Sequence, residues 1–127
     1  MIIKVISPLS VAVGKKKYYL NLNSYRNWHY QVNNNVKKAY KAVMLEQLQD
    51  LRLKKIDIEY QLFYGDKRKR DKGNITSVIQ KFFLDALVET GCIVDDNDSF
   101  VGVETLCEPI YDKGKPRCEI TITPRSL

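Results

Sequence analysis

The chain has 127 residues, of which 44% are hydrophobic and 28% charged, and its net charge is +6 at pH 7. This length leaves room for a single domain, residues 1–127, and the hydrophobic fraction excludes a mainly disordered chain. No apolar run approaches the roughly 20 residues that cross a bilayer, so we expect no membrane segment. The three cysteines form no Cys-x-x-Cys pair and indicate neither a zinc site nor a disulfide framework, so we expect a cytoplasmic protein.

The positive charge is concentrated in the first part of the chain. Residues 1–72 hold 16 lysines and arginines against 6 acidic residues, whereas residues 73–127 hold 5 against 9. A basic half favours attraction to a polyanion such as nucleic acid. Surface lysines that only keep the protein soluble would also give a modest positive total. Composition alone does not separate these two explanations.

The first half predicts two short strands and one long helix. The strands lie over residues 1–7 and 17–22, separated by Pro8 and Gly14. Residues 28–50 predict an amphipathic helix, with Trp28 and His29 packed together at its start. Its expected buried face consists of Val32, Val36, Ala39, Tyr40 and Val43. The opposite face carries Asn34, Lys37, Lys38 and Lys41, and it is either solvated or in contact with DNA.

The second half predicts a strand, a helix and two further strands. Residues 56–64 alternate between apolar and polar side chains, which is typical of a half-buried strand. A helix is expected from Ile75 to Thr90, ended by Gly91, with Lys81 and Asp85 emerging side by side. The last two strands, residues 100–107 and 117–123, are separated by "YDKGKP", whose residues are typical of a hairpin turn. The order β(β)αβαββ predicts a mixed α/β fold, a small mixed sheet with two main helices packed on it.

Two charged segments suggest phosphodiester chemistry. "KRKRDKGN", residues 67–74, places four cations directly before Asp71, and "IVDDNDSF", residues 93–100, holds Asp95, Asp96 and Asp98. Mg²⁺ prefers oxygen ligands and activates water for hydrolysis, so Asp71 and the later aspartates would form a metal site if they converged. Taken singly, each segment is more often a solvated loop. The cations that would hold a nucleic-acid backbone are Lys15, Lys16, Lys17, Lys67, Arg68, Lys69 and Arg70.

Residues 66–123 resemble the RusA-type Holliday junction resolvases, in a variant like those of prophages and Gram-positive bacteria. The shared pattern is a basic run, Arg70-Asp71, a lysine (Lys81) four residues before Asp85-Ala86-Leu87, then Asp95-Asp96, and a final strand "EITIT". The resemblance implies a homodimeric, Mg²⁺-dependent endonuclease, with Mn²⁺ able to substitute, that acts in DNA recombination and repair. Such an enzyme binds four-way DNA junctions and makes paired nicks, without a small-molecule cofactor.

The resemblance also implies roles for individual residues. Asp71 and Asp96 would be catalytic, metal-binding carboxylates, Lys81 the catalytic lysine, and Arg70 a phosphate contact. Asp95 and Asn74 are further candidate metal ligands.

The chain departs from the family pattern at Gly73, where a second aspartate is expected, and in a longer segment between Asp71 and Lys81. Either Asn74, Asp85, Asp95 or Asp98 replaces that ligand, or the metal is held more weakly, or junctions are bound without being cut. We expect replacement, with Asn74 or Ser77 facing the site. The alternatives are a non-catalytic branched-DNA-binding protein on the same fold and a metal nuclease without preference for junctions.

Overall fold

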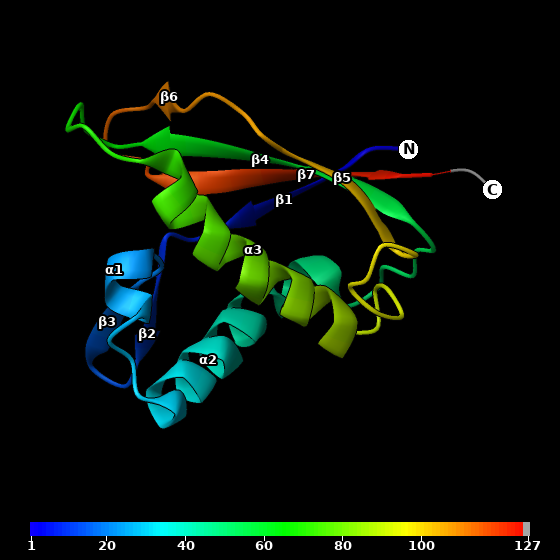
Figure 1. Cartoon of the computed structure of the whole chain (residues 1–127), viewed down its shortest axis with the longest axis horizontal. Coiled ribbons are helices and arrows are strands. Elements are labelled where there is room, and N and C mark those ends of the chain that lie inside the picture. The colour runs from blue at the N-terminus through cyan, green and yellow to red at the C-terminus, as the bar shows by residue number, and fades with distance from the viewer. Residues whose placement is uncertain (126–127) are drawn as a thin grey trace.

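The computed structural model describes residues 1–125. They form a mixed sheet, a separate two-stranded hairpin and three helices (Figure 1), which confirms the mixed α/β class. The strands that neighbour one another in the main sheet are, in order, β1 (Ile3–Ser7), β7 (Arg117–Pro124), β4 (Ile56–Tyr64) and β5 (Val101–Leu106), and β6 (Ile110–Tyr111) also pairs with β4. The separate hairpin consists of β2 (Ser10–Val13) and β3 (Lys16–Tyr19).

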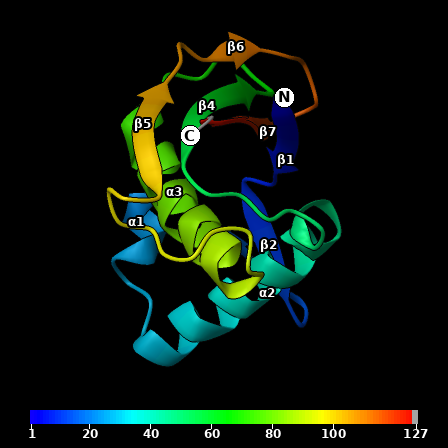
Figure 2. The same ribbon diagram turned by 90° about the vertical axis from the view of Figure 1, so that its right-hand side faces the viewer.

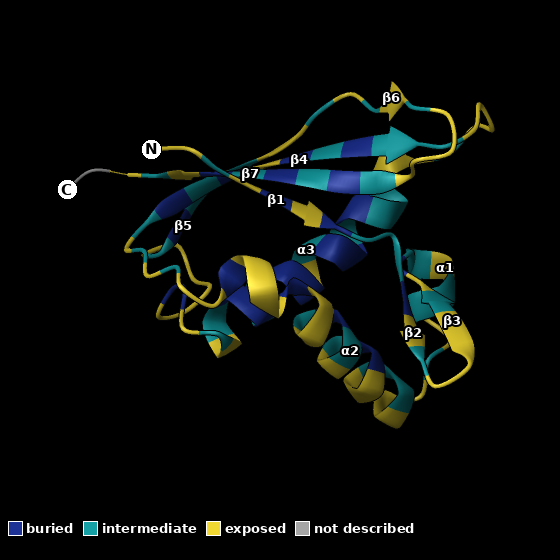
Figure 3. Cartoon of the chain, turned by 180° about the vertical axis from the view of Figure 1, so that it is seen from behind, coloured by how far each residue is buried: buried dark blue, intermediate teal, exposed yellow. Residues whose placement is uncertain are grey.

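The helices are α1 (Leu22–Tyr25), α2 (Tyr30–Leu48) and α3 (Lys72–Glu89). Figures 1 and 2 show α2 and α3 on the same side of the curved sheet. The predicted alternation in β4 is confirmed, because Ile56, Ile58, Tyr60 and Leu62 are buried against this side while the residues between them are not. Figure 3 shows the alternation as dark and light bands along β4 and β7. The core therefore lies between the sheet and the two long helices.

The predicted helices exist, but two details of them are wrong. The buried stripe of α2 is Val36, Tyr40, Met44 and Leu48, whereas Val43 is 53% exposed. This stripe follows the four-residue spacing, and Val43 lies on its solvent side. The predicted start of α3 at Ile75 is also wrong, because α3 begins at Lys72 with Asp71 as its capping residue.

The predicted pairing of the last two long strands is wrong. β4 lies between them, parallel to β5 and antiparallel to β7. The chain passes from β4 through α3 to β5, which is the crossover that a parallel pair requires. The turn within "YDKGKP" exists, since the Lys115 amide donates to the Asp112 carbonyl at 3.1 Å, but it leads from β6 to β7.

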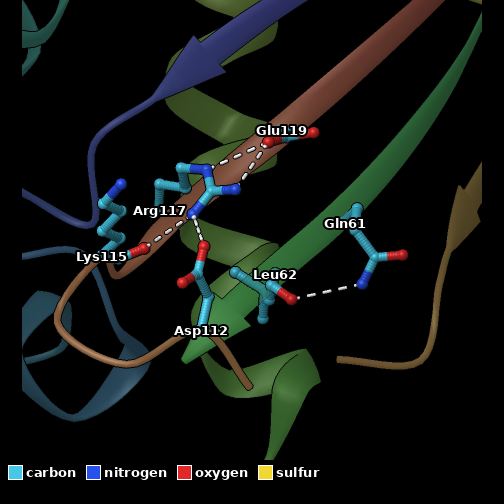
Figure 4. Close-up of polar contacts among 6 residues, drawn as sticks. All are labelled: Gln61, Leu62, Asp112, Lys115, Arg117 and Glu119. Carbon is cyan, nitrogen blue, oxygen red and sulfur yellow. Dashed lines mark hydrogen bonds and ion pairs between the residues drawn. The ribbon is translucent and has the colours of Figure 1, made fainter. Parts of the chain in front are cut away.

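Arg117 holds this turn against the end of β4 (Figure 4). Its guanidinium pairs with Asp112 at 2.8 Å and with Glu119 at 2.9 Å. The guanidinium also lies 3.9 Å from the centre of the Phe63 ring. Hydrogen bonds to the two carboxylates raise the pKa of Arg117. The turn also reaches the residue after β4, because the Gly114 amide donates to the Gly65 carbonyl. The loop that follows β4 therefore starts from a fixed position.

Candidate nucleic-acid interface

The basic run lies on the loop between β4 and α3, where Asp66 organises it. One Asp66 carboxylate oxygen accepts hydrogen bonds from the Arg68 amide at 2.9 Å and from the Arg70 guanidinium at 2.7 Å. These donors lower the pKa of Asp66, the Arg68 amide having the larger effect. The Arg70 guanidinium also lies 4.7 Å from the centre of the Tyr64 ring. Arg70 is thus held in place, while Lys67, Arg68 and Lys69 are exposed.

The structure brings part of the hairpin to this loop. Lys17 of β3 lines a cavity of about 480 Å³ together with Arg68 and Arg70. Two further hollows adjoin it, and Arg70 lines all three. We call the three together the basic groove. Its cations are Lys17, Arg68, Lys69, Arg70 and Lys72.

The other predicted cations lie outside this groove. Lys16 lines a neighbouring pocket, and Lys15 follows Gly14 at the tip of the hairpin, where a positive φ of 62° suits glycine. The Lys67 ammonium lies 5.2 Å from the centre of the Tyr111 ring.

Asp71 lies at the edge of the groove and caps α3. Its Oδ1 accepts a hydrogen bond from the Gly73 amide at 2.9 Å. This is the usual N-cap arrangement, and a carboxylate here also interacts favourably with the positive end of the helix dipole. Gly73, where the resemblance would place a second aspartate, supplies its backbone amide to this cap.

Asn74 supports the fold at the same place. Its side-chain oxygen accepts a hydrogen bond from the Leu22 amide, the first residue of α1, at 2.8 Å. The oxygen proposed as a metal ligand therefore already has a partner from another helix. Ser77 is not among the residues that line the groove.

The acidic loop lies at the other end of α3. Asp71 precedes the first residue of this helix, whereas Asp95 and Asp96 follow its last residue. Eighteen helical residues span about 27 Å, and Figure 1 shows the two loops at opposite ends of α3. The Asp95 carboxylate accepts bonds from the Asp96 amide at 2.7 Å and from the Asn97 side chain at 3.2 Å. The expected convergence of Asp71 and Asp96 is wrong within one chain.

Lys81 and Asp85 lie one turn apart on α3, as expected, but Asp85 forms its ion pair with another helix. Asp85 pairs with Lys37 of α2 at 2.9 Å, and Glu89 pairs with Lys41 at 3.2 Å. Two lysines assigned to the outer face of α2 therefore connect it to α3. Lys81 is exposed on α3, ten residues beyond Asp71, or about 15 Å along the helix.

The predicted Mg²⁺ ligands consequently do not fit a single site in this chain. Residues 1–125 contain no group of three or more histidine, cysteine, aspartate or glutamate side chains that could hold a metal ion. The carboxylate that does share a hollow with Asp71 is Glu108, from the connection between β5 and β6, with Arg70 and Lys72 beside it. Sequence analysis missed Glu108, because its position depends on the parallel pairing of β5 and β6 with β4.

Comparison of the sequence with protein-family models and with curated proteins finds no match. In the described part of the chain, none of the helices combines the length and apolar composition needed to cross a membrane.

Proposed function

We propose that the chain binds DNA, and branched DNA in particular, along the basic groove. The most direct support is that two cationic segments line one groove although they are about fifty positions apart in sequence. Lys17 belongs to the first segment and Arg68 to the second. Nothing in local folding requires these like charges to gather. A polyanion lying along the groove would offset their mutual repulsion.

The cations of the groove are available to phosphates. Of the cations in the groove, only Arg70 forms an ion pair within residues 1–125, and its partner is Asp66. Lys17, Arg68 and Lys69 are exposed. The amino end of α3 adds backbone N–H groups near Asp71, where a helix terminus favours anions. The preference for branched DNA follows from the resemblance of residues 66–123 to the RusA-type resolvases.

The test compares a four-way junction with a linear duplex of the same sequence in a titration at several salt concentrations. The double variant Lys17→Gln/Arg68→Gln removes two groove cations, and Lys38→Gln/Lys54→Gln removes two exposed lysines outside the groove. We expect the groove variant to reduce the slope of log affinity against log salt by about two, one for each lost phosphate contact. The control variant should leave that slope nearly unchanged.

Equal losses in the two double variants would contradict the proposal, because the protein would then attract DNA only through its net charge. Equal affinity for junction and duplex would contradict the branched-DNA part alone.

A second candidate function is the Mg²⁺-dependent endonuclease that the resemblance implies. The observation that favours it is the shared hollow of Asp71 and Glu108 at the end of the groove. Mg²⁺ is commonly held by one or two carboxylates together with substrate phosphates. Asp71 and Glu108 would be its protein ligands, and the ion would supply an activated water.

Nicking of a labelled junction under Mg²⁺ or Mn²⁺ tests this candidate. A site within one chain predicts that Asp71→Asn and Glu108→Gln abolish nicking. It also predicts that Asp96→Asn retains nicking, because Asp96 lies beyond the opposite end of α3. Tight junction binding without any nicking would leave the protein as a non-catalytic DNA-binding protein.

A further inference from the structure

A pocket lined by aromatic and basic side chains lies between β3 and the segment that connects α1 to α2. Its volume is about 470 Å³. Strand β3 supplies Lys16 and Lys17 with Tyr18 and Tyr19, and the facing segment supplies Trp28 and His29. None of the sequence patterns discussed above predicts this pocket, because it requires the hairpin to fold back beside the start of α2.

One wall of the pocket is rigid and the other is open. Trp28 packs parallel to Phe82 of α3, with an interplanar angle of 5°, and meets Tyr18 edge-on at 5.7 Å. Packing on Phe82, which is buried, therefore fixes the indole ring. Tyr19, in contrast, is 55% exposed, and its ring has the Lys17 ammonium 5.8 Å from its centre. An exposed ring beside a fixed aromatic wall is suited to stacking a flat ligand.

Strand β3, which lines the pocket, also has an edge with unpaired backbone groups within residues 1–125. Strand β3 pairs only with β2, so its other edge has no strand partner within residues 1–125. Pairing in antiparallel strands alternates, and the bond from the Leu20 amide to the Leu9 carbonyl sets which residues face β2. By this alternation, the backbone N–H of Lys17 and that of Tyr19 point to the free edge. A planar heterocycle would find hydrogen-bond donors there.

The pocket adjoins the basic groove, because Lys17 and Tyr19 line both. A DNA strand whose phosphates lie along the groove can therefore reach the pocket with one of its bases. That base can enter the pocket only if it is unpaired. We propose that this pocket binds an unpaired nucleobase of branched DNA, stacked on Tyr19 and Trp28. The proposal rests on the proposed DNA binding and specifies which DNA structure is recognised.

The experiment uses two DNA duplexes that differ at one position. The first carries a single unpaired nucleotide, and the second carries an abasic sugar at the same place. We expect the wild-type protein to bind the first about 5-fold to 150-fold more tightly, the range typical of one base stacked on an aromatic side chain. Tyr19→Ala should remove this preference, whereas Tyr19→Phe keeps the ring and should retain it.

The matched control is Tyr30→Ala, since Tyr30 is 72% exposed and does not line the pocket. It should bind both duplexes as the wild type does. Trp28 is the only tryptophan of the chain, so quenching of its fluorescence by the first duplex but not by the abasic one gives a second readout.

Equal affinity of the wild type for the two duplexes would overturn the base pocket and leave DNA binding by the groove intact. A Tyr19→Ala variant that weakens binding of both duplexes equally would also overturn it, since Tyr19 would then contact only the backbone. Failure of the wild type to bind either duplex would overturn the proposed DNA binding together with the pocket.

Discussion

Asp71 has a structural role that any functional experiment on it must take into account. Its carboxylate caps α3 through the Gly73 amide, and it also faces the groove beside Arg70. A substitution that removes the carboxylate for mechanistic reasons will also remove the cap unless the new side chain accepts the same hydrogen bond. Asparagine and aspartate are similarly good capping residues, whereas alanine is poor.

We therefore predict that Asp71→Ala lowers the free energy of unfolding by about 1 kcal/mol and that Asp71→Asn changes it by much less. Urea denaturation followed by circular dichroism measures both. With this result, loss of nicking in Asp71→Asn would report the lost charge and not a loosened helix. Equal destabilisation by the two substitutions would show that the carboxylate stabilises the fold by its charge and not by the cap.

Cys118 makes the stability of the fold sensitive to alkaline pH. Its side chain is fully buried in β7, and burial raises the pKa of the thiol to about 12 from an ordinary value near 9. Burial also raises the pKa of Tyr40, which shares a hydrogen bond of 2.7 Å with Ser7. Both groups are neutral when protonated, so the folded state binds more protons than the unfolded state at high pH.

The sign of the effect follows from this proton difference. The stabilisation is complete below pH 9 and is lost progressively as the pH rises toward 12. We predict that the free energy of unfolding falls between pH 9 and pH 11 and falls less steeply in Cys118→Ala. Urea denaturation at several pH values measures both slopes. Identical slopes would show that Cys118 does not cause the decline.

At the scale of elements, sequence patterns predicted which segments form helices and strands better than how those segments meet. The alternation over residues 56–64 was confirmed, and so was a helix that ends before Gly91, because each element has one buried face. Pairing is not local, so the turn residues near Gly114 indicated a hairpin although β4 lies between β5 and β7. In the same way, periodicity placed Lys37 opposite the buried face without indicating that Asp85 lies across from it.

Asn74 connects α1 and α3. This structural role leads to a prediction that differs from the one for a metal ligand. Its side-chain oxygen is the partner of the Leu22 amide, so Asn74→Ala leaves that amide without its acceptor. We predict faster hydrogen exchange of the Leu22 amide and a loss of about 1 kcal/mol in the free energy of unfolding. Asn74→Asp retains an acceptor oxygen and serves as the control. Unchanged exchange in Asn74→Ala would contradict this role.

At the scale of the whole molecule, the sequence predicted individual residues of the candidate site but not how those residues are arranged in space. Both cationic groups were identified from their charge, yet their meeting at Arg70 depends on how the hairpin packs beside the loop after β4. The separation of Asp71 from Asp96 could have been predicted from the sequence. A continuous helix of this length holds its two ends apart, and the expected convergence overlooked that constraint.

A homodimer, as the resemblance implies, offers another way to unite these carboxylates. If two chains pair so that Asp71 of one copy meets Asp96 of a second copy, each active site is shared. Neither Asp71→Asn nor Asp96→Asn would then nick junctions alone. In a mixture of the two variants, half of the dimers would be mixed, and each mixed dimer would have one intact site and one doubly substituted site.

We therefore predict for a shared site that unfolding and refolding the two variants together restores about a quarter of the wild-type nicking activity. Single nicks should replace paired ones, because each mixed dimer can cut only one strand. Light scattering on the wild type provides the check that a dimer forms. If Asp96→Asn alone keeps full activity while Glu108→Gln loses it, the site lies within one chain. A different result would exclude a shared site: the wild type nicks DNA, but neither single variant nor their mixture does. Asp71 and Asp96 would then both be required, and mixed dimers would not restore activity.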